Sequence, residues 1–167
     1  KGVRGGMKGG ARGGGGDLPN LDVDLAVNIL AGFNSETLSK ASLRLETRKG
    51  DIGALSLKGS FSGAPISASL SGADKRIVLQ SANAGAMLRF ADLYGRLAGG
   101  ALQAHIAPDG GQVLIRDFAI LNEPTMEHLL TESPRSIPVD PGNVPFTKLR
   151  ASFTRAPDRI NIQEGVL

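Results

Sequence analysis

Side chains that could carry out catalysis are few in this sequence, and they are not grouped. Its two histidines, His105 and His128, stand apart from any arrangement of a nucleophile with an acid, so ordinary surface roles explain them better. Asp22 and Asp24 share one face of a predicted strand and could bind a cation, but a solvated polar face explains them better. The absence of cysteine excludes Cys-ligated zinc and thiol nucleophiles. We therefore predict no enzyme, no catalytic residue, no metal site and no cofactor.

The first sixteen residues, KGVRGGMKGGARGGGG, could contact nucleic acid through four basic side chains. They carry a charge of +4, whereas the whole chain carries +3, so the remaining residues sum to about −1. A folded nucleic-acid-binding domain normally has a basic surface of its own. The segment also lacks the aromatic side chains that stack on bases. We predict a flexible Gly-rich basic linker over residues 1–19 and no nucleic-acid partner, with an RNA-associated arm as the alternative.

The rest of the chain, residues 20–167, is long enough for one domain with a core. Aromatic residues make up only 4% of the sequence, and tryptophan is absent. A core of Leu, Ile, Val and Ala must therefore be thin or shared. No run of about eighteen apolar residues is present, so the sequence predicts no membrane-spanning helix.

Apolar and polar residues alternate from residue 20 onward, which is the pattern of strands with two different faces. The first element, NLDVDLAVNILAG, places apolar side chains on odd positions and polar ones mostly on even positions. Short turns separate it from similar segments, including a turn at 49–51. The sequence therefore predicts a meander of five antiparallel strands, at 20–32, 38–51, 52–61, 66–72 and 76–82.

The period then changes to three and four. The segment 83–97 predicts a short amphipathic helix of about ten residues, with Asn83 as its N-cap and Gly95 as its stop. A second short helix is predicted at 122–133. Four further strands bring the total to nine. The strand at 112–120 has apolar residues at both odd and even positions, which predicts that it is covered on both faces. These four strands are expected at 101–108, 112–120, 146–155 and 159–167.

Two helices of about ten residues cannot cover one apolar face of nine strands. Another copy, the rest of a longer protein or an apolar ligand must therefore lie against that face. Small residues alternate with aliphatic ones along several strands, so a concave sheet could leave an open trough. Closure by neighbouring segments of a longer protein explains the same pattern equally well.

Three runs of sequence carry an ordered set of features: LQSANAGAMLRFADLYGRLAGGALQAHI, IRDFAILNEPTMEHLL and VPFTKLRASFTRAPDRINIQEGVL. The features are a strand, a helix opening at Ala84-Gly85, a strand start at Gly99-Gly100, a strand ending in Asp117-Phe118, a short helix after Asn122-Glu123-Pro124, and a closing hairpin begun by Phe146. This order resembles the C-terminal part of AsmA-like proteins, a group that includes the TamB-type and YhdP-type proteins of Gram-negative bacteria. The resemblance covers roughly residues 20–167.

The resemblance implies a mainly β fold, in which long antiparallel strands form a curved, groove-like sheet with two short capping helices. It implies a fragment of a larger periplasmic protein, anchored to the inner membrane by parts absent from this sequence. It further implies outer-membrane biogenesis through transport of phospholipid along the groove, with other envelope proteins as possible partners. A structural β-module that binds no lipid is the alternative.

The residues expected to line the groove are the aliphatic side chains on the apolar face of the strands. An ordinary core role explains each of them equally well. They are Val23, Leu25, Val27, Leu43, Leu45, Leu55, Leu57, Ile66, Leu70, Ile77, Leu79, Leu102 and Ile106.

Overall fold

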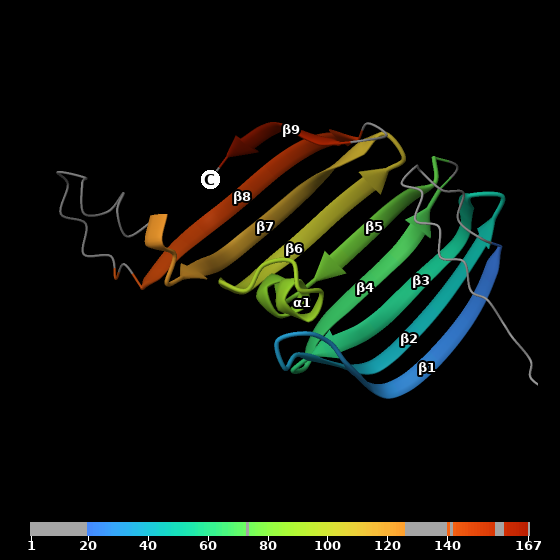
Figure 1. The fold of residues 1–167 in the computed structure, drawn as a ribbon, viewed down its shortest axis with the longest axis horizontal. Helices are drawn as coiled ribbons and strands as arrows, with labels where there is room; N and C mark the ends of the chain where they lie inside the picture. The colour runs from blue at the N-terminus through green and yellow to red at the C-terminus, as the bar shows by residue number, and fades with distance from the viewer. Residues whose placement is uncertain (1–19, 73, 126–139, 141, 156–158, 167) are drawn as a thin grey trace, which may run out of the picture.

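One antiparallel sheet dominates the computed structural model, which describes residues 20–72, 74–125, 140, 142–155 and 159–166. Within these residues nine strands pair in the order of the chain (Figure 1). The predicted meander and the predicted number of strands are confirmed. The strands are β1 (Leu21–Ala31), β2 (Thr37–Arg48), β3 (Asp51–Phe61), β4 (Ala64–Ser71), β5 (Arg76–Ser81), β6 (Leu97–Ala107), β7 (Gly110–Leu121), β8 (Asn143–Arg155) and β9 (Ile160–Val166).

Tight turns fix the register of the first strands. Lys49 and Gly50 join β2 to β3 with φ values of 50° and 84°, and Ser62 and Gly63 join β3 to β4 with φ values of 49° and 86°. Positive φ at both central residues matches the right-handed twist of the flanking strands. The predicted turn at Lys49-Gly50 is therefore confirmed.

The helix α1 (Ala84–Phe90) begins as the sequence predicts but ends earlier. The Asn83 side chain accepts a hydrogen bond from the Ala86 N–H at 3.0 Å, which satisfies a free donor of the first turn. The helix ends where Asp92 adopts a φ of 54°, and the Leu93 N–H donates to the Leu88 carbonyl. This is a Schellman motif, with Asp92 in the position that glycine usually takes. The predicted stop at Gly95 is therefore wrong.

The left-handed conformation of Asp92 has local support. The Asn34 side-chain amide donates to the Arg89 carbonyl at 3.0 Å and to Asp92 Oδ1 at 3.2 Å. The loop before β2 therefore holds the end of the helix. Because the helix stops at Phe90, Leu93 and Tyr94 lie in the exposed loop that follows it, although the predicted helical segment 83–97 includes them.

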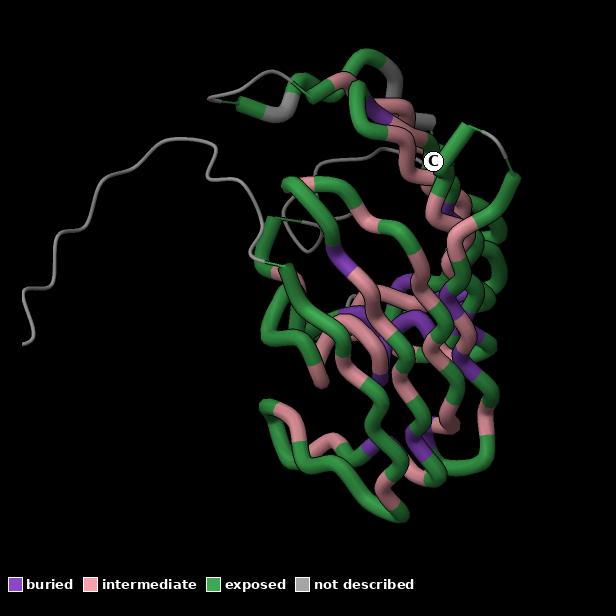
Figure 2. The backbone as a smooth tube through the Cα atoms, turned by 90° about the vertical axis from the view of Figure 1, so that its right-hand side faces the viewer, coloured by how far each residue is buried: buried purple, intermediate pink, exposed green. Residues whose placement is uncertain are grey.

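The core lies between α1 and the strands beneath it, at one end of the strands in the middle of the sheet (Figure 1). Phe61 and Phe90 meet with ring centroids 5.3 Å apart, and Phe118 and Phe146 stack at the same separation. In Figure 2 most buried positions lie in the middle of the molecule, and a few lie near its upper and lower ends, among exposed and half-buried backbone. Two clusters of buried residues form this core, the first from Ala84, Leu97, Leu102, Ala104, Ile115 and Phe118, the second from Leu38, Ala41, Phe61, Ile66 and Ala86.

The strand β7 is not covered on both faces, contrary to the prediction from its apolar residues of both parities. Ile115 and Phe118 have opposite parity, yet both lie in one buried cluster. The strand is interrupted between them at Asp117, whose φ is 53°, and Gly100 interrupts β6 nearby with a φ of 85°. Such irregularities re-aim the side chains that follow. Leu114 remains half-buried on the polar face, opposite Gln103 of β6 and Arg150 of β8. Ala119 and Leu121, beyond the interruption, are also half-buried on that side.

The sheet is twisted but not strongly curled (Figure 1). The predicted second helix falls mainly on residues 126–139, and the predicted linker is residues 1–19; both lie outside the described residues. In the described part of the chain, no helix is long and apolar enough to cross a membrane.

Candidate functional site

The strand register places one apolar row across eight strands. Residues directly opposite each other in antiparallel strands point to the same side of a sheet. At a strand spacing of 4.7–4.9 Å, the row is roughly 34 Å wide. From β1 to β8 it consists of Leu25, Leu43, Leu57, Ala68, Leu79, Ala104, Val113 and Ala151.

A second row runs beside the first, farther from α1. Gly111 interrupts it on β7, where the Phe153 ring leans so close that a Cβ on Gly111 would lie 2.9 Å from Phe153 Cζ. The aromatic ring therefore fills the space that a side chain would take. The row contains Val23, Leu45, Leu55, Leu70, Ile77, Ile106, Phe153 and Ile162. The two rows together are called the apolar face below.

All thirteen predicted lining residues lie on this side of the sheet, but their cover differs. Ile66 and Leu102 are only 6% and 4% exposed, because they belong to the clusters beneath α1. These two side chains are core. The other eleven are half-buried or exposed, and Leu25 reaches 39% exposure. The helix therefore covers one end of the strands and leaves the other end open.

A hollow of about 210 Å³ lies at the open end. Its apolar wall includes Leu70, Ile77 and Ile106, and the same hollow is bounded by Asp51, Lys75 and Arg155. Lys75 Nζ forms an ion pair with Asp51 Oδ2 at 2.9 Å. The apolar wall and the charged groups therefore meet at the ends of the strands that lie away from α1.

Sequence reasoning missed Ile52, which also lines this hollow. The pairing of β2 with β3 shifts between Glu46 and Thr47, and this shift brings Ile52 opposite the buried Thr47. Gly53 inside the strand is a signal of such an irregularity and could have indicated the change of face. The regular alternation hid it.

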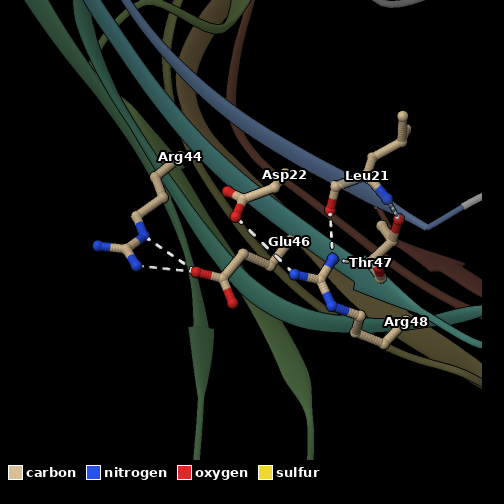
Figure 3. A network of polar contacts seen from close by, with 6 residues as sticks. All are labelled: Leu21, Asp22, Arg44, Glu46, Thr47 and Arg48. Atoms are coloured by element: carbon tan, nitrogen blue, oxygen red, sulfur yellow. Dashed lines mark hydrogen bonds and ion pairs between the residues drawn. The ribbon is translucent and has the colours of Figure 1, made fainter.

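The polar face carries a network of charges near the start of β1 (Figure 3). Arg44 Nη2 lies 2.8 Å from Glu46 Oε1, and Arg48 Nη2 lies 3.8 Å from Asp22 Oδ2. The hydrogen bond from Arg44 and the charge of its guanidinium lower the pKa of Glu46 below its ordinary value. The cationic neighbour of Asp22 is thus Arg48. Among the described residues, no group of three or more potential metal ligands occurs.

His105 is exposed on the polar face of β6, opposite Val78 and Gln112. His128 lies outside the described residues. Compared with protein-family models, with curated proteins and with solved structures, the chain matches none.

Proposed function

We propose that this chain is a non-enzymatic module that shields phospholipid acyl chains on the apolar face of its sheet. The observation that carries the proposal is the open apolar face, with eleven of the thirteen predicted lining residues not buried. The resemblance to AsmA-like proteins supports the setting. In the setting that this resemblance implies, the parent protein is anchored in the inner membrane, spans the periplasm and carries phospholipid between the inner and outer membranes.

The size of the apolar face suits an acyl chain. A bilayer's hydrocarbon core is about 30 Å thick and contains two layers of chains, so one chain extends about 15 Å. The first row, roughly 34 Å wide, exceeds that length, although Ala68 and Ala104 within it are buried and leave the side chains on either side of them for contact. Transfer of ten methylenes out of water is worth about 8 kcal/mol, which is the free energy that such a face could supply during transfer.

The charged edge of the hollow suits the other part of a phospholipid. Lys75 and Arg155 lie beside the apolar wall of Leu70 and Ile106. A lipid whose chains lie on that wall can keep its head group in water next to these cations. No catalytic side chain is needed for this role.

A purely structural β-module is the second candidate, because the sheet is not strongly curled. A layer of protein can pack on such a face as well as lipid does. The Gly/Arg arm of the RNA-associated alternative lies outside the described residues, so the structure adds nothing in its favour.

The test is a double substitution on the apolar face, Leu45→Asp with Leu57→Asp. Charged groups there should abolish the copurification of phospholipid, because a carboxylate in contact with acyl chains is costly. Organic extraction and native mass spectrometry of the purified protein measure bound lipid, and circular dichroism checks that the sheet remains.

A matched control introduces the same charges on the other side of the same strands. Ser42 and Ser56 are exposed on the polar face of the same two strands, and like Leu45 and Leu57 each lies two residues from the position directly opposite the other. Ser42→Asp with Ser56→Asp should retain lipid. Lipid retained at wild-type levels by the folded double variant of Leu45 and Leu57 contradicts the proposal. Absence of lipid from the wild-type protein favours the structural module.

A further inference from the structure

Two arginines of β2 on the polar face are paired with carboxylates, whereas three cations of β7 and β8 on the same face are not paired in the described part of the chain. Near β1, Arg44 and Arg48 each have a carboxylate neighbour (Figure 3). On β7 and β8, three exposed cations have no ion pair or hydrogen bond with any described residue. These three side chains, Arg116, Lys148 and Arg150, are called the basic cluster.

The register brings the cluster together. Arg116 lies directly opposite Lys148 across the β7–β8 ladder, and Arg150 follows two residues along β8 on the same face. Like charges directly opposite each other destabilise a sheet. Among the side chains that the structure describes, no carboxylate forms an ion pair with the three cations, so their positive charge is not neutralised within that part of the chain. The arrangement is unfavourable unless an anion binds to it.

A hollow of about 330 Å³ joins the three cations. Polar side chains of β6 and β7 complete its wall, including Gln103, His105 and Gln112. The volume falls in the range of small-molecule sites. The amides and the imidazole supply neutral hydrogen-bond donors beside the charged ones.

We propose that the basic cluster binds a phosphate group, either of a soluble phosphate ester or of a lipid head group. Guanidinium groups bind phosphate through paired N–H donors, and the lysine adds a point charge. A phosphomonoester carries about −1.5 to −2 charges, which matches the positive charge of the cluster better than a single carboxylate does. The phosphodiester of a lipid head group carries one negative charge, and there the paired N–H donors of the two guanidinium groups favour phosphate. The site lies on the face opposite to the proposed lipid-shielding face and does not depend on that function.

The test compares two double variants that lose the same charge. Arg116→Gln with Arg150→Gln removes both guanidinium groups of the cluster, whereas Lys58→Gln with Arg76→Gln removes two exposed cations elsewhere. Isothermal titration calorimetry with sn-glycerol 3-phosphate measures binding of a soluble ester. Flotation with vesicles of phosphatidylcholine, with and without phosphatidylglycerol, measures binding of head groups.

The cluster variant should bind at least about tenfold more weakly than wild type, because each lost charged hydrogen bond is worth about a factor of ten or more. The control variant should bind as wild type does. Binding of glycerol 3-phosphate indicates a soluble ester, and binding only to phosphatidylglycerol vesicles indicates a lipid head group. Equal binding by both variants overturns the proposal. So does binding of polyglutamate without binding of either phosphate probe, because it indicates an acidic protein partner.

Thermal unfolding gives a readout that does not depend on the variants' affinity measurements. Phosphate at constant ionic strength should raise the Tm of the wild-type protein and of the control, and leave that of the cluster variant unchanged. Without phosphate the cluster variant should be at least as stable as wild type, because it loses a like-charge repulsion. If phosphate does not change the Tm of the wild-type protein, the proposal that the basic cluster binds phosphate is wrong.

Discussion

Gly85 allows α1 to approach the backbone of β6 closely, and a single added methyl group tests this contact. A Cβ at this position would lie 2.3 Å from the Leu97 carbonyl oxygen and 3.1 Å from Ala98 Cα. Ordinary contact begins at 3.4 Å, so in Gly85→Ala the helix must move away by about 1 Å. The atoms that it meets belong to the backbone and cannot rotate aside.

The cost follows from what the helix covers. A gap of 0.5–1 Å already removes a quarter to a half of the dispersion attraction at a contact. Overpacking with a backbone shift costs about 1–3 kcal/mol, and the rigid neighbour places this case near the upper value. Alanine regains about 1 kcal/mol over glycine as a helix former. The net loss of unfolding free energy is about 2 kcal/mol, which lowers Tm by about 4–8 °C in a chain of this size.

Urea denaturation measures this loss as a lower midpoint at an unchanged m-value. Gly95→Ala is the matched control, because no atom lies within 4 Å of its added Cβ. That variant should change stability by less than about 0.5 kcal/mol. If Gly85→Ala is as stable as Gly95→Ala, the helix does not pack on β6 as closely as described.

Two titrations test the electrostatics of the surface. Although Tyr94 lies in an exposed loop, part of its ring is shielded from water, which raises its pKa, and the hydrogen bond that it donates to Glu123 at 3.1 Å raises the pKa further. Tyr94 is the only tyrosine and tryptophan is absent, so ultraviolet titration should show a phenol pKa above the ordinary value and a smaller shift in Glu123→Gln. The lowered pKa of Glu46 implies a stabilising contribution that is present above the unfolded-state pKa and lost as pH falls through the folded-state pKa. In Arg44→Gln, NMR titration should find the Glu46 pKa closer to its ordinary value.

The strands could be predicted from sequence because alternation and turn chemistry are local. Most large apolar residues of the first five strands recur at every second position, and the Lys49-Gly50 turn is indicated by its residue types. A meander also needs no long-range information, since each strand pairs with the next. For the same reason the sequence predicted that thirteen aliphatic residues share one face.

Features that depend on contacts between distant segments escaped prediction. The helix ends at Phe90 because Asn34, more than fifty residues earlier, holds the left-handed Asp92. The cover of Ile66 and Leu102 depends on where α1 lies across the strands, and periodicity contains no such information. Periodicity shows that a face is apolar; only the packing of other elements shows how much of it is open.

The apolar face and the polar face that carries the basic cluster are the two sides of one sheet, so only the thickness of one strand layer separates them. Alternate residues of one strand therefore serve different surfaces: on β8, Ala151 and Phe153 belong to the apolar face, whereas Lys148 and Arg150 belong to the basic cluster. Such a strand cannot move its register by one residue without exchanging the two surfaces. The like-charge pair Arg116–Lys148 and the apolar rows are thus linked through one register, and the β7–β8 ladder, which pairs Phe118 with Phe146 in the core, supports both proposed sites at once.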